Sequence, residues 1–194
     1  MSIMNRLVML HGMTGTSAKM RPLAESLVPH DWDVVCPEGT YVHPRTGRAW
    51  WVREEVIGTA TPADQILVSM KSLEQNLPDG KLILGGFSQG GAIASAMLET
   101  SIEERIVGLV LLATMTVREE QLRKILRSIR PRSVVWMHGE RDHIVNIDDG
   151  LNLASIFEDA GWNVIHLRHG KGHMVDLNQK DSLVDAIRIM SEGN

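Results

Sequence analysis

A single serine lies between two pairs of glycines in residues 84–91, which read L-G-G-F-S-Q-G-G. Ser88 is the centre of a G-x-S-x-G pattern whose outer positions are Gly86 and Gly90. Glycine is used where another backbone comes too close for a Cβ atom. On a sharp turn from strand to helix, a serine with this spacing exposes its hydroxyl as a nucleophile. The spacing does not match a phosphate-binding loop, and a turn with packing glycines is the alternative.

A serine nucleophile needs a base, and the base needs an acid that orients it. Asp142 lies in H-G-E-R-D, just after the apolar residues 134–137. His173 lies in R-H-G-K-G-H, just after the apolar residues 164–167. Chemistry gathers at the carboxyl ends of strands in parallel sheets, and both positions follow such ends. The sequence therefore predicts Ser88 as nucleophile, His173 as base and Asp142 as orienting acid.

Other residues compete for two of these roles. His169 is nearer to the strand end and is an alternative base, whereas His166, inside the strand, is expected to pack. Glu140 is a lesser alternative acid because Arg141 beside it indicates a solvated turn. Three further carboxylates fall where helix starts need caps; they are Asp148, Asp149 and Asp176.

The loop H-G-M-T-G-T-S follows the first apolar run and precedes a helix expected near Ala18. A developing oxyanion is stabilised by one backbone N–H from the residue after the nucleophile and one from an early loop of this kind. This predicts the N–H groups of Gln89 and Met13 as donors. His11 is expected to be a structural histidine bonded to the loop backbone.

Short apolar runs that read as buried strands alternate with helical spacing along the whole chain. The strands are expected near residues 7–10, 34–35, 82–84, 106–113, 134–137 and 164–167. The helices are expected near residues 62–77, 90–100, 118–129, 148–160 and 177–190. This alternation predicts an α/β fold with a mostly parallel sheet of about six strands and helices on both faces. The longest stretch without clear periodicity is residues 37–61, and long loops of this kind are often functional.

Composition limits the possible classes of protein. The chain has 194 residues, of which 43% are hydrophobic and 23% charged, with a net charge of -4. These values predict one domain over residues 1–194 and argue against a disordered chain or a nucleic-acid-binding surface. The single cysteine, Cys36, is expected to be a small buried residue and fits a reducing compartment. No apolar run near the start is long enough for a signal or a span, so we expect a cytoplasmic protein without stable membrane association.

The motifs together resemble the α/β-hydrolase carboxylesterases related to acyl-protein thioesterases and lysophospholipases. The resemblance covers nearly the whole chain, through L-H-G at 10–12, P-E-G at 37–39, G-R-A-W at 47–50, G-F-S-Q-G-G at 86–91, H-G-E-R-D at 138–142 and G-H at 172–173. It implies the same triad and the same two oxyanion donors. The chain departs from the family by Asn146 in place of a common proline, and by M-T-G-T after the first L-H-G.

The resemblance implies a serine hydrolase that cleaves small carboxylic esters or thioesters, with no metal and no cofactor, as a monomer or homodimer. The strand at residues 106–113 is followed almost directly by a helix, so no large lid is expected and the site should be open. Trp50, Trp51 and Met115 are expected at the substrate pocket. The alternatives are an amidase, peptidase or acyltransferase with the same triad, and a ligand-binding protein without turnover.

Overall fold

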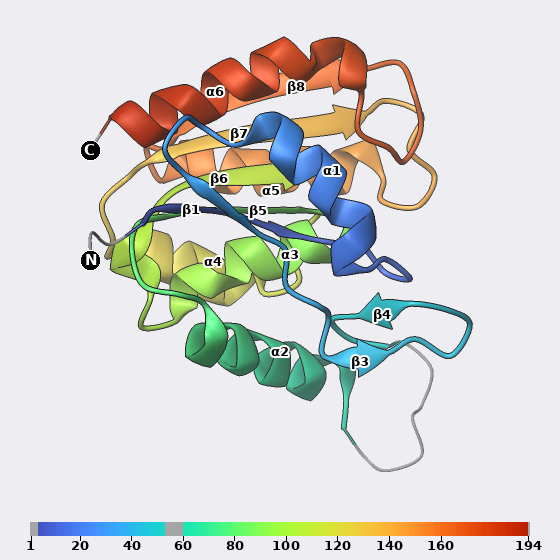
Figure 1. Cartoon of the computed structure of the whole chain (residues 1–194). Coiled ribbons are helices and arrows are strands. Elements are labelled where there is room, and N and C mark those ends of the chain that lie inside the picture. The colour runs from blue at the N-terminus through green and yellow to red at the C-terminus, as the bar shows by residue number, and fades with distance from the viewer. Residues whose placement is uncertain (1–3, 53–59, 194) are drawn as a thin grey trace.

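The computed structural model describes residues 4–52 and 60–193, and its centre is a six-stranded parallel sheet (Figure 1). The strand order is β2-β1-β5-β6-β7-β8. The strands are β1 (Arg6–Leu10), β2 (Asp33–Val35), β5 (Leu82–Phe87), β6 (Ile106–Leu112), β7 (Ser133–Gly139) and β8 (Asn163–His169). Each overlaps one of the six expected strands, so the predicted α/β class and strand number are confirmed.

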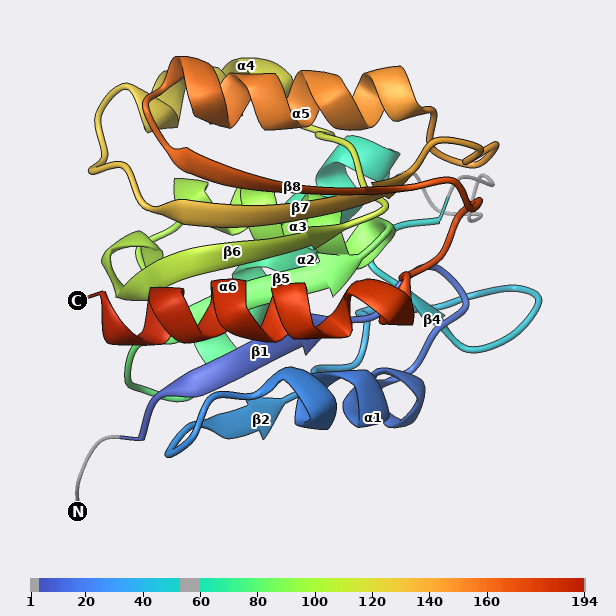
Figure 2. The same cartoon turned by 90° about the horizontal axis from the view of Figure 1, so that it is seen from above.

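Helices cover both faces of this sheet (Figures 1 and 2). They are α1 (Ser17–Leu27), α2 (Pro62–Asn76), α3 (Gln89–Ala96), α4 (Glu119–Leu126), α5 (Ile147–Asp159) and α6 (Lys180–Glu192), with short 3-10 turns at Met97–Glu99, Glu103–Arg105 and Leu177–Gln179. Helices α1 and α6 contact one face, while α3 and α5 contact the other and are packed in turn by α2 and α4. Only residues 113–118 separate β6 from α4, as the sequence predicts.

The alternation of side chains along each strand divides the core into two layers. In β1, Leu7 and Met9 belong to the cluster that includes α1 and α6, whereas Val8 and Leu10 belong to the cluster on the opposite face. Successive side chains of a strand point to opposite faces, and both faces are buried here. The continuous apolar runs of the sequence follow from this double burial.

Local signals fix where helix α2 begins. The hydroxyl of Thr61 accepts a hydrogen bond from the Asp64 N–H, the Asp64 carboxylate accepts one from the Thr61 N–H, and Pro62 occupies the first turn. This capping box satisfies two N–H groups that the helix itself leaves unpaired. Helix α2 packs Ile66 and Met70 into the core.

The stretch of residues 37–61 holds secondary structure that its sequence did not reveal. Strands β3 (Tyr41–Val42) and β4 (Arg48–Ala49) pair as an antiparallel hairpin. Gly47 in its turn has a φ of 64°, which glycine adopts without the steric cost of a Cβ atom. Residues 53–59 of the same stretch lie outside the described residues.

The strand order indicates that a ligand site can form at the carboxyl ends of the strands. The chain passes from β1 to β2 on one side and later enters β5 on the other side of β1. Such a reversal of strand order is where ligands bind in open α/β sheets, at the carboxyl ends of the strands. Register pairs Leu10 with Gly86 and Phe87 with Leu112, so the loops after β1, β5 and β6 leave the sheet side by side.

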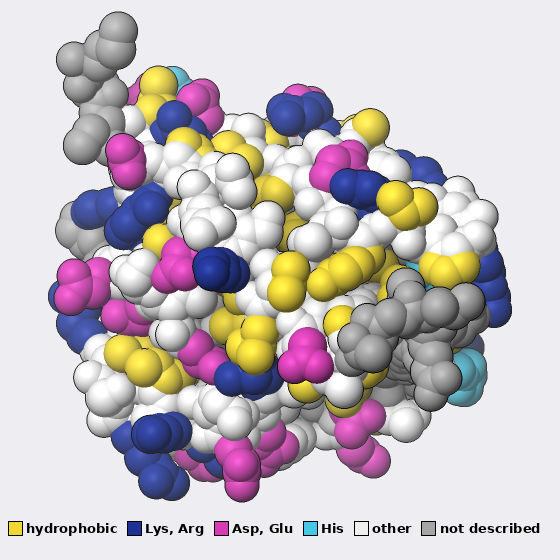
Figure 3. Space-filling model, turned by 90° about the horizontal axis from the view of Figure 1, so that it is seen from below, with side chains coloured by type: hydrophobic (Ala, Val, Ile, Leu, Met, Phe, Trp, Pro, Cys, Tyr) yellow, Lys and Arg dark blue, Asp and Glu magenta, His cyan; other side chains and the backbone are white. Residues whose placement is uncertain are grey.

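The surface carries both signs of charge. Figure 3 shows Lys and Arg side chains interspersed with Asp and Glu over the face that it presents, rather than gathered by sign. Among helices of the described residues, none has the length and apolar character that crossing a membrane requires.

Candidate active site

Ser88 occupies a strained turn between β5 and α3. Its φ is 53° and its ψ is -119°, in a region that residues with a Cβ atom rarely adopt. The Ser88 N–H donates to the Leu112 carbonyl at 2.9 Å, and the Thr114 hydroxyl donates to the Ser88 carbonyl at 2.7 Å. Both peptide groups of the serine are therefore held by β6 and the residues directly after it.

The two glycines of the G-x-S-x-G pattern are required by close approach of backbones. A Cβ atom on Gly86 would lie 2.5 Å from the carbonyl carbon of Gly90, and one on Gly90 would overlap the Leu10 carbonyl. Real Cβ atoms do not come this close to backbone atoms. The steric role predicted for these glycines is therefore confirmed.

Asp142 and His173 form a direct pair at the same edge of the sheet. His173 Nδ1 lies 2.7 Å from Asp142 Oδ2, and the Asp142 side chain is fully buried. Because a carboxylate oxygen accepts, Nδ1 of His173 carries the proton, and Nε2 is left as the basic nitrogen. This is the tautomer that a general base acting on a serine requires.

Backbone groups hold the other oxygen of Asp142. Oδ1 accepts hydrogen bonds from the N–H groups of Ile144 at 2.8 Å and Val145 at 3.0 Å. Burial alone would raise the pKa of Asp142, but the hydrogen bonds from Val145, His173 and Ile144 outweigh it and hold the pKa below its usual value. The carboxylate is thus kept charged beside the imidazole.

Phe87 connects the histidine to the serine turn. The rings of Phe87 and His173 lie with their centroids 4.8 Å apart, and Phe87 immediately precedes Ser88. The three predicted triad residues therefore come from loops that meet at one edge.

The alternative residues lie in other environments. His169 ends β8 and is buried, and its Nδ1 accepts from the Lys171 N–H. Glu140 pairs with Arg168 at 3.2 Å, and Asp176 pairs with Lys171 and caps the turn before α6. Asp148 and Asp149 lie in the first turn of α5, as expected.

The loop after β1 is organised around His11. Its Nδ1 donates to the Gly12 carbonyl at 2.7 Å and its Nε2 accepts from the Gly39 N–H at 2.9 Å. Burial lowers the pKa of His11, so the ring is neutral and bridges two loops, which agrees with the structural role predicted for it.

A cavity of about 170 Å³ opens beside Ser88. Met13 and Gln89, the predicted oxyanion donors, both line it, as do Trp51 and Met115. The Gln89 side chain is anchored away from the cavity, because its Oε1 accepts from the Trp50 N–H and its Nε2 donates to the Trp51 carbonyl. These bonds hold Gln89, the first residue of α3, in place.

Trp50 was expected at the substrate pocket, but it does not line the cavity beside Ser88. Its side chain is only 1% exposed, is not among the cavity's lining residues, and donates from Nε1 to the His11 carbonyl at 2.8 Å. The structure thus gives Trp50 a role in holding the loop after β1, while the neighbouring Trp51 lines the cavity.

Two residues at this edge were missed by sequence reasoning. Thr114 lines the cavity and holds the Ser88 carbonyl, and His138 is fully buried with Nε2 donating to the Val145 carbonyl at 2.9 Å. Their only sequence signal is position, since Thr114 lies just beyond β6 and His138 near the end of β7. Within residues 4–52 and 60–193, no group of three or more His, Cys, Asp or Glu side chains is placed to hold a metal ion.

A parallel sheet whose strand order reverses beside a strained serine turn, with a carboxylate–histidine pair on later loops, defines the α/β-hydrolase class. The family model described as "alpha/beta hydrolase fold" matches residues 5–133. Because the match covers more than half of the chain, the chain belongs to this family.

Two relatives that match in sequence are acyl-protein thioesterases. The chain is 27% identical over 120 residues to acyl-protein thioesterase 1 of Debaryomyces hansenii, covering 60% of this chain and 50% of the relative. It is 24% identical over 119 residues to the Neurospora crassa protein of the same name, covering 59% and 48%. The chain thus spans about half the length of the curated relatives it matches.

Solved structures share the fold. A crystal structure of Zea mays acyl-protein thioesterase 2 has a TM-score of 0.72 at 17% identity, with 98% of this chain and 95% of that chain covered. A Bacillus cereus carboxylesterase has a TM-score of 0.73 at 20% identity, with 98% and 89% covered. The resemblance that the motifs predict is therefore confirmed.

Proposed function

We propose that this protein is a serine hydrolase that cleaves carboxylic esters or thioesters of small acyl substrates through an acyl-enzyme on Ser88. The observation that carries the proposal is the 2.7 Å pair of His173 and buried Asp142 at the edge where Ser88 sits in its strained turn. Similarity to acyl-protein thioesterases and carboxylesterases supports the same chemistry.

In the first half of the reaction, Ser88 Oγ attacks the acyl carbon while its proton passes to Nε2 of His173. Asp142 holds the tautomer and stabilises the imidazolium that forms. The tetrahedral intermediate then collapses. The bond from carbon to the ester oxygen or thioester sulfur breaks, and the same proton passes from His173 to the leaving atom.

In the second half, water replaces the alcohol or thiol. His173 takes a proton from the water as its oxygen attacks the acyl carbon, and returns the proton to Ser88 Oγ as the acyl–serine bond breaks. The carboxylic acid leaves and the free serine is restored.

We assign the oxyanion hole to the backbone N–H groups of Gln89 and Met13. Gln89 is the first residue of α3, whose N-terminal dipole favours negative charge, and both residues line the Ser88 cavity. Among the backbone–backbone hydrogen bonds of turns and loops in the described residues, neither N–H is a donor. Trp51 and Met115 form apolar wall for the acyl group.

The cellular setting is part of the proposal. Cys36, the chain's one cysteine, is buried, and burial raises the pKa of its thiol to about 11. A chain with one inert thiol and no partner thiol fits a reducing compartment. We therefore propose that the enzyme acts in the cytoplasm.

The decisive experiment replaces the nucleophile. Ser88→Ala should abolish covalent labelling by a fluorophosphonate probe and lower kcat by about 10⁶-fold, the loss typical of a triad nucleophile. The matched control is Ser95→Ala on the same helix, since Ser95 is also buried and its hydroxyl donates to the Ala92 carbonyl. Labelling that persists in a folded Ser88→Ala protein would refute the assignment.

A further inference from the structure

A second cavity, of about 250 Å³, shares one lining residue, Met13, with the cavity described above. Met13 is 39% exposed. Gly12 allows this arrangement, because a Cβ atom there would lie 2.9 Å from the Phe87 ring. The loop after β1 thus contributes to the walls of both cavities.

Phe87 connects the second cavity to His173. Phe87 lines it, and the ring of Phe87 lies against that of His173. The first cavity is lined instead by Gln89, Ala92 and Thr114, on the side of α3. The general acid must reach the leaving atom to protonate it, so a leaving group extends toward the histidine.

Lys19 supplies the charge of this second cavity. It is the one charged side chain among the lining residues, all of which belong to the described part of the chain, and it is exposed. Both oxygens of the Glu38 carboxylate face groups of this region: Oε1 accepts from the Ser17 N–H at 2.9 Å, and Oε2 lies 3.9 Å from Nε2 of His11, which lines the cavity. An ammonium group placed in this way favours an anion on the bound group.

We propose that this second cavity binds the leaving group of the substrate, and that Lys19 selects alcohols or thiols that carry a carboxylate or another anion. The inference rests on the proposed function, because it uses the direction of proton transfer from His173. The inference adds that the acyl group occupies the cavity beside Ser88, that the leaving group occupies the second cavity, and that the leaving group is anionic.

The experiment compares two matched thioesters, S-butyryl-3-mercaptopropanoate and S-butyryl-3-mercaptopropanamide, which differ in one charge. A butyryl group suits the first cavity, because an apolar cavity of about 150 Å³ already holds benzene. Lys19→Met should lower kcat/KM for the anionic thioester about threefold, the size typical of an exposed ion pair, and leave the neutral one unchanged. Lys19→Glu should lower it about tenfold, and high salt should reduce both differences.

Lys124→Met on α4 is the matched control for loss of one positive charge from an exposed helix position. This variant should keep the wild-type ratio of kcat/KM for the anionic thioester to kcat/KM for the neutral thioester. An equal change on both thioesters in Lys19→Met, or no change on either, would overturn the role of Lys19.

A second measurement separates this inference from the proposed function. The Ser88→Ala protein, with or without Lys19→Met, is titrated with each intact thioester, and binding is followed by ligand-observed NMR. Tighter binding of the anionic thioester that depends on Lys19 supports the inference even if turnover fails. Equal binding of both thioesters contradicts the inference even if Ser88 proves to be the nucleophile.

Discussion

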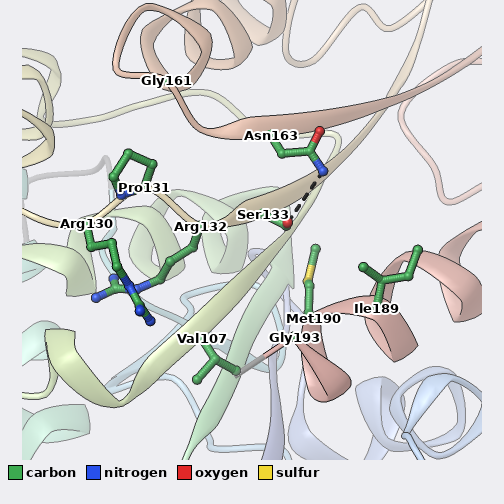
Figure 4. Close-up of a pocket in the computed structure, with 10 residues that line it drawn as sticks. All are labelled: Val107, Arg130, Pro131, Arg132, Ser133, Gly161, Asn163, Ile189, Met190 and Gly193. Carbon is green, nitrogen blue, oxygen red and sulfur yellow. Dashed lines mark hydrogen bonds between the residues drawn. The ribbon is translucent and has the colours of Figure 1, made fainter.

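Cavities lie at both edges of the sheet, and the one beside the strained serine is smaller than the one at the amino edge. The cavity at the amino edge has a volume of about 400 Å³, against about 170 Å³ beside Ser88. Figure 4 shows Met190 and Ile189 of α6 on one side of it and the side chains of Arg130 and Arg132 on the other. Its lining residues, all in the described part of the chain, include no carboxylate and no histidine.

The difference between the edges lies in backbone strain and in buried polar groups. At the carboxyl edge, Ser88 and Ala113 have φ angles of 53° and 48°, and Asp142 is buried. Among the residues that line the amino-edge cavity, only Gly161 has a positive φ, which glycine adopts without a steric cost, and the largely buried Arg132 pairs with Glu103. Strain and buried charge cost stability and persist where the surrounding structure enforces them. Their convergence, more than volume, distinguishes the candidate site.

After replacement of Ser88, the largest effect is expected from removing the charge of Asp142 at the carboxyl edge. Asp142→Asn should lower kcat about 10⁴-fold, because an amide in place of the carboxylate favours the wrong tautomer of the catalytic histidine. Steady-state rates on a butyryl thioester measure the loss, and thermal unfolding checks the fold. Glu140→Gln is the control, since Glu140 is exposed and pairs with Arg168; its rate should stay within about twofold, as for surface substitutions. A loss below tenfold in Asp142→Asn would contradict the assignment.

An intermediate effect is expected from removing the hydroxyl of Thr114 at the carboxyl edge, and no effect from removing that of Ser133 at the amino edge. Thr114→Val deletes the donor to the Ser88 carbonyl and should lower stability by about 1 kcal/mol and kcat about tenfold, because the turn is held less firmly. Ser133→Ala deletes a hydroxyl at the amino edge that accepts from Asn163 at 3.4 Å. It should leave kcat unchanged.

Two results would decide this comparison of the edges. Thr114→Ser keeps the donor and should restore most of the rate. Equal losses of kcat in Thr114→Val and Ser133→Ala would show that the two edges do not differ in the way proposed.

The sheet was predictable because its signals are local. A buried strand such as β6 is a continuous run of Val, Ile and Leu, and both of its faces are covered. Ser88 was predictable for a similar reason, since its turn needs glycines at fixed spacing. Asp142 and His173 were found from their places after two strands, which the parallel order brings to one edge.

Contacts between distant segments were not predictable from these signals. The hydroxyl of Thr114 meets a carbonyl 26 residues away, and the Gln89 side chain holds Trp50 at 39 residues' separation. Strands β3 and β4 have two residues each, too few for an alternation to be seen. The direction of the Trp50 ring, into the core and away from the cavity, depends on these same contacts.

The smallest expected effect is a pH dependence of stability confined to the carboxyl edge. Burial lowers the pKa of His138 in the folded protein, whereas an unfolded histidine titrates near about 6.5. Between these two values the unfolded chain binds a proton that the folded chain does not, so the free energy of unfolding falls as pH drops from 7 to 5. Asp142, with its lowered pKa, affects stability only below about pH 4.

His138→Gln tests this origin, because an amide at that position keeps a donor for the Val145 carbonyl and does not titrate. The loss of unfolding free energy between pH 7 and 5, measured by urea denaturation, should be smaller in this variant by up to about 1 kcal/mol. His30→Gln replaces a histidine whose side chain is 93% exposed and should leave the wild-type loss unchanged. The arginines of the amino edge keep their charge over this range. A loss of the wild-type size in His138→Gln would contradict this origin, and His11, whose pKa burial also lowers, is then the next histidine to replace.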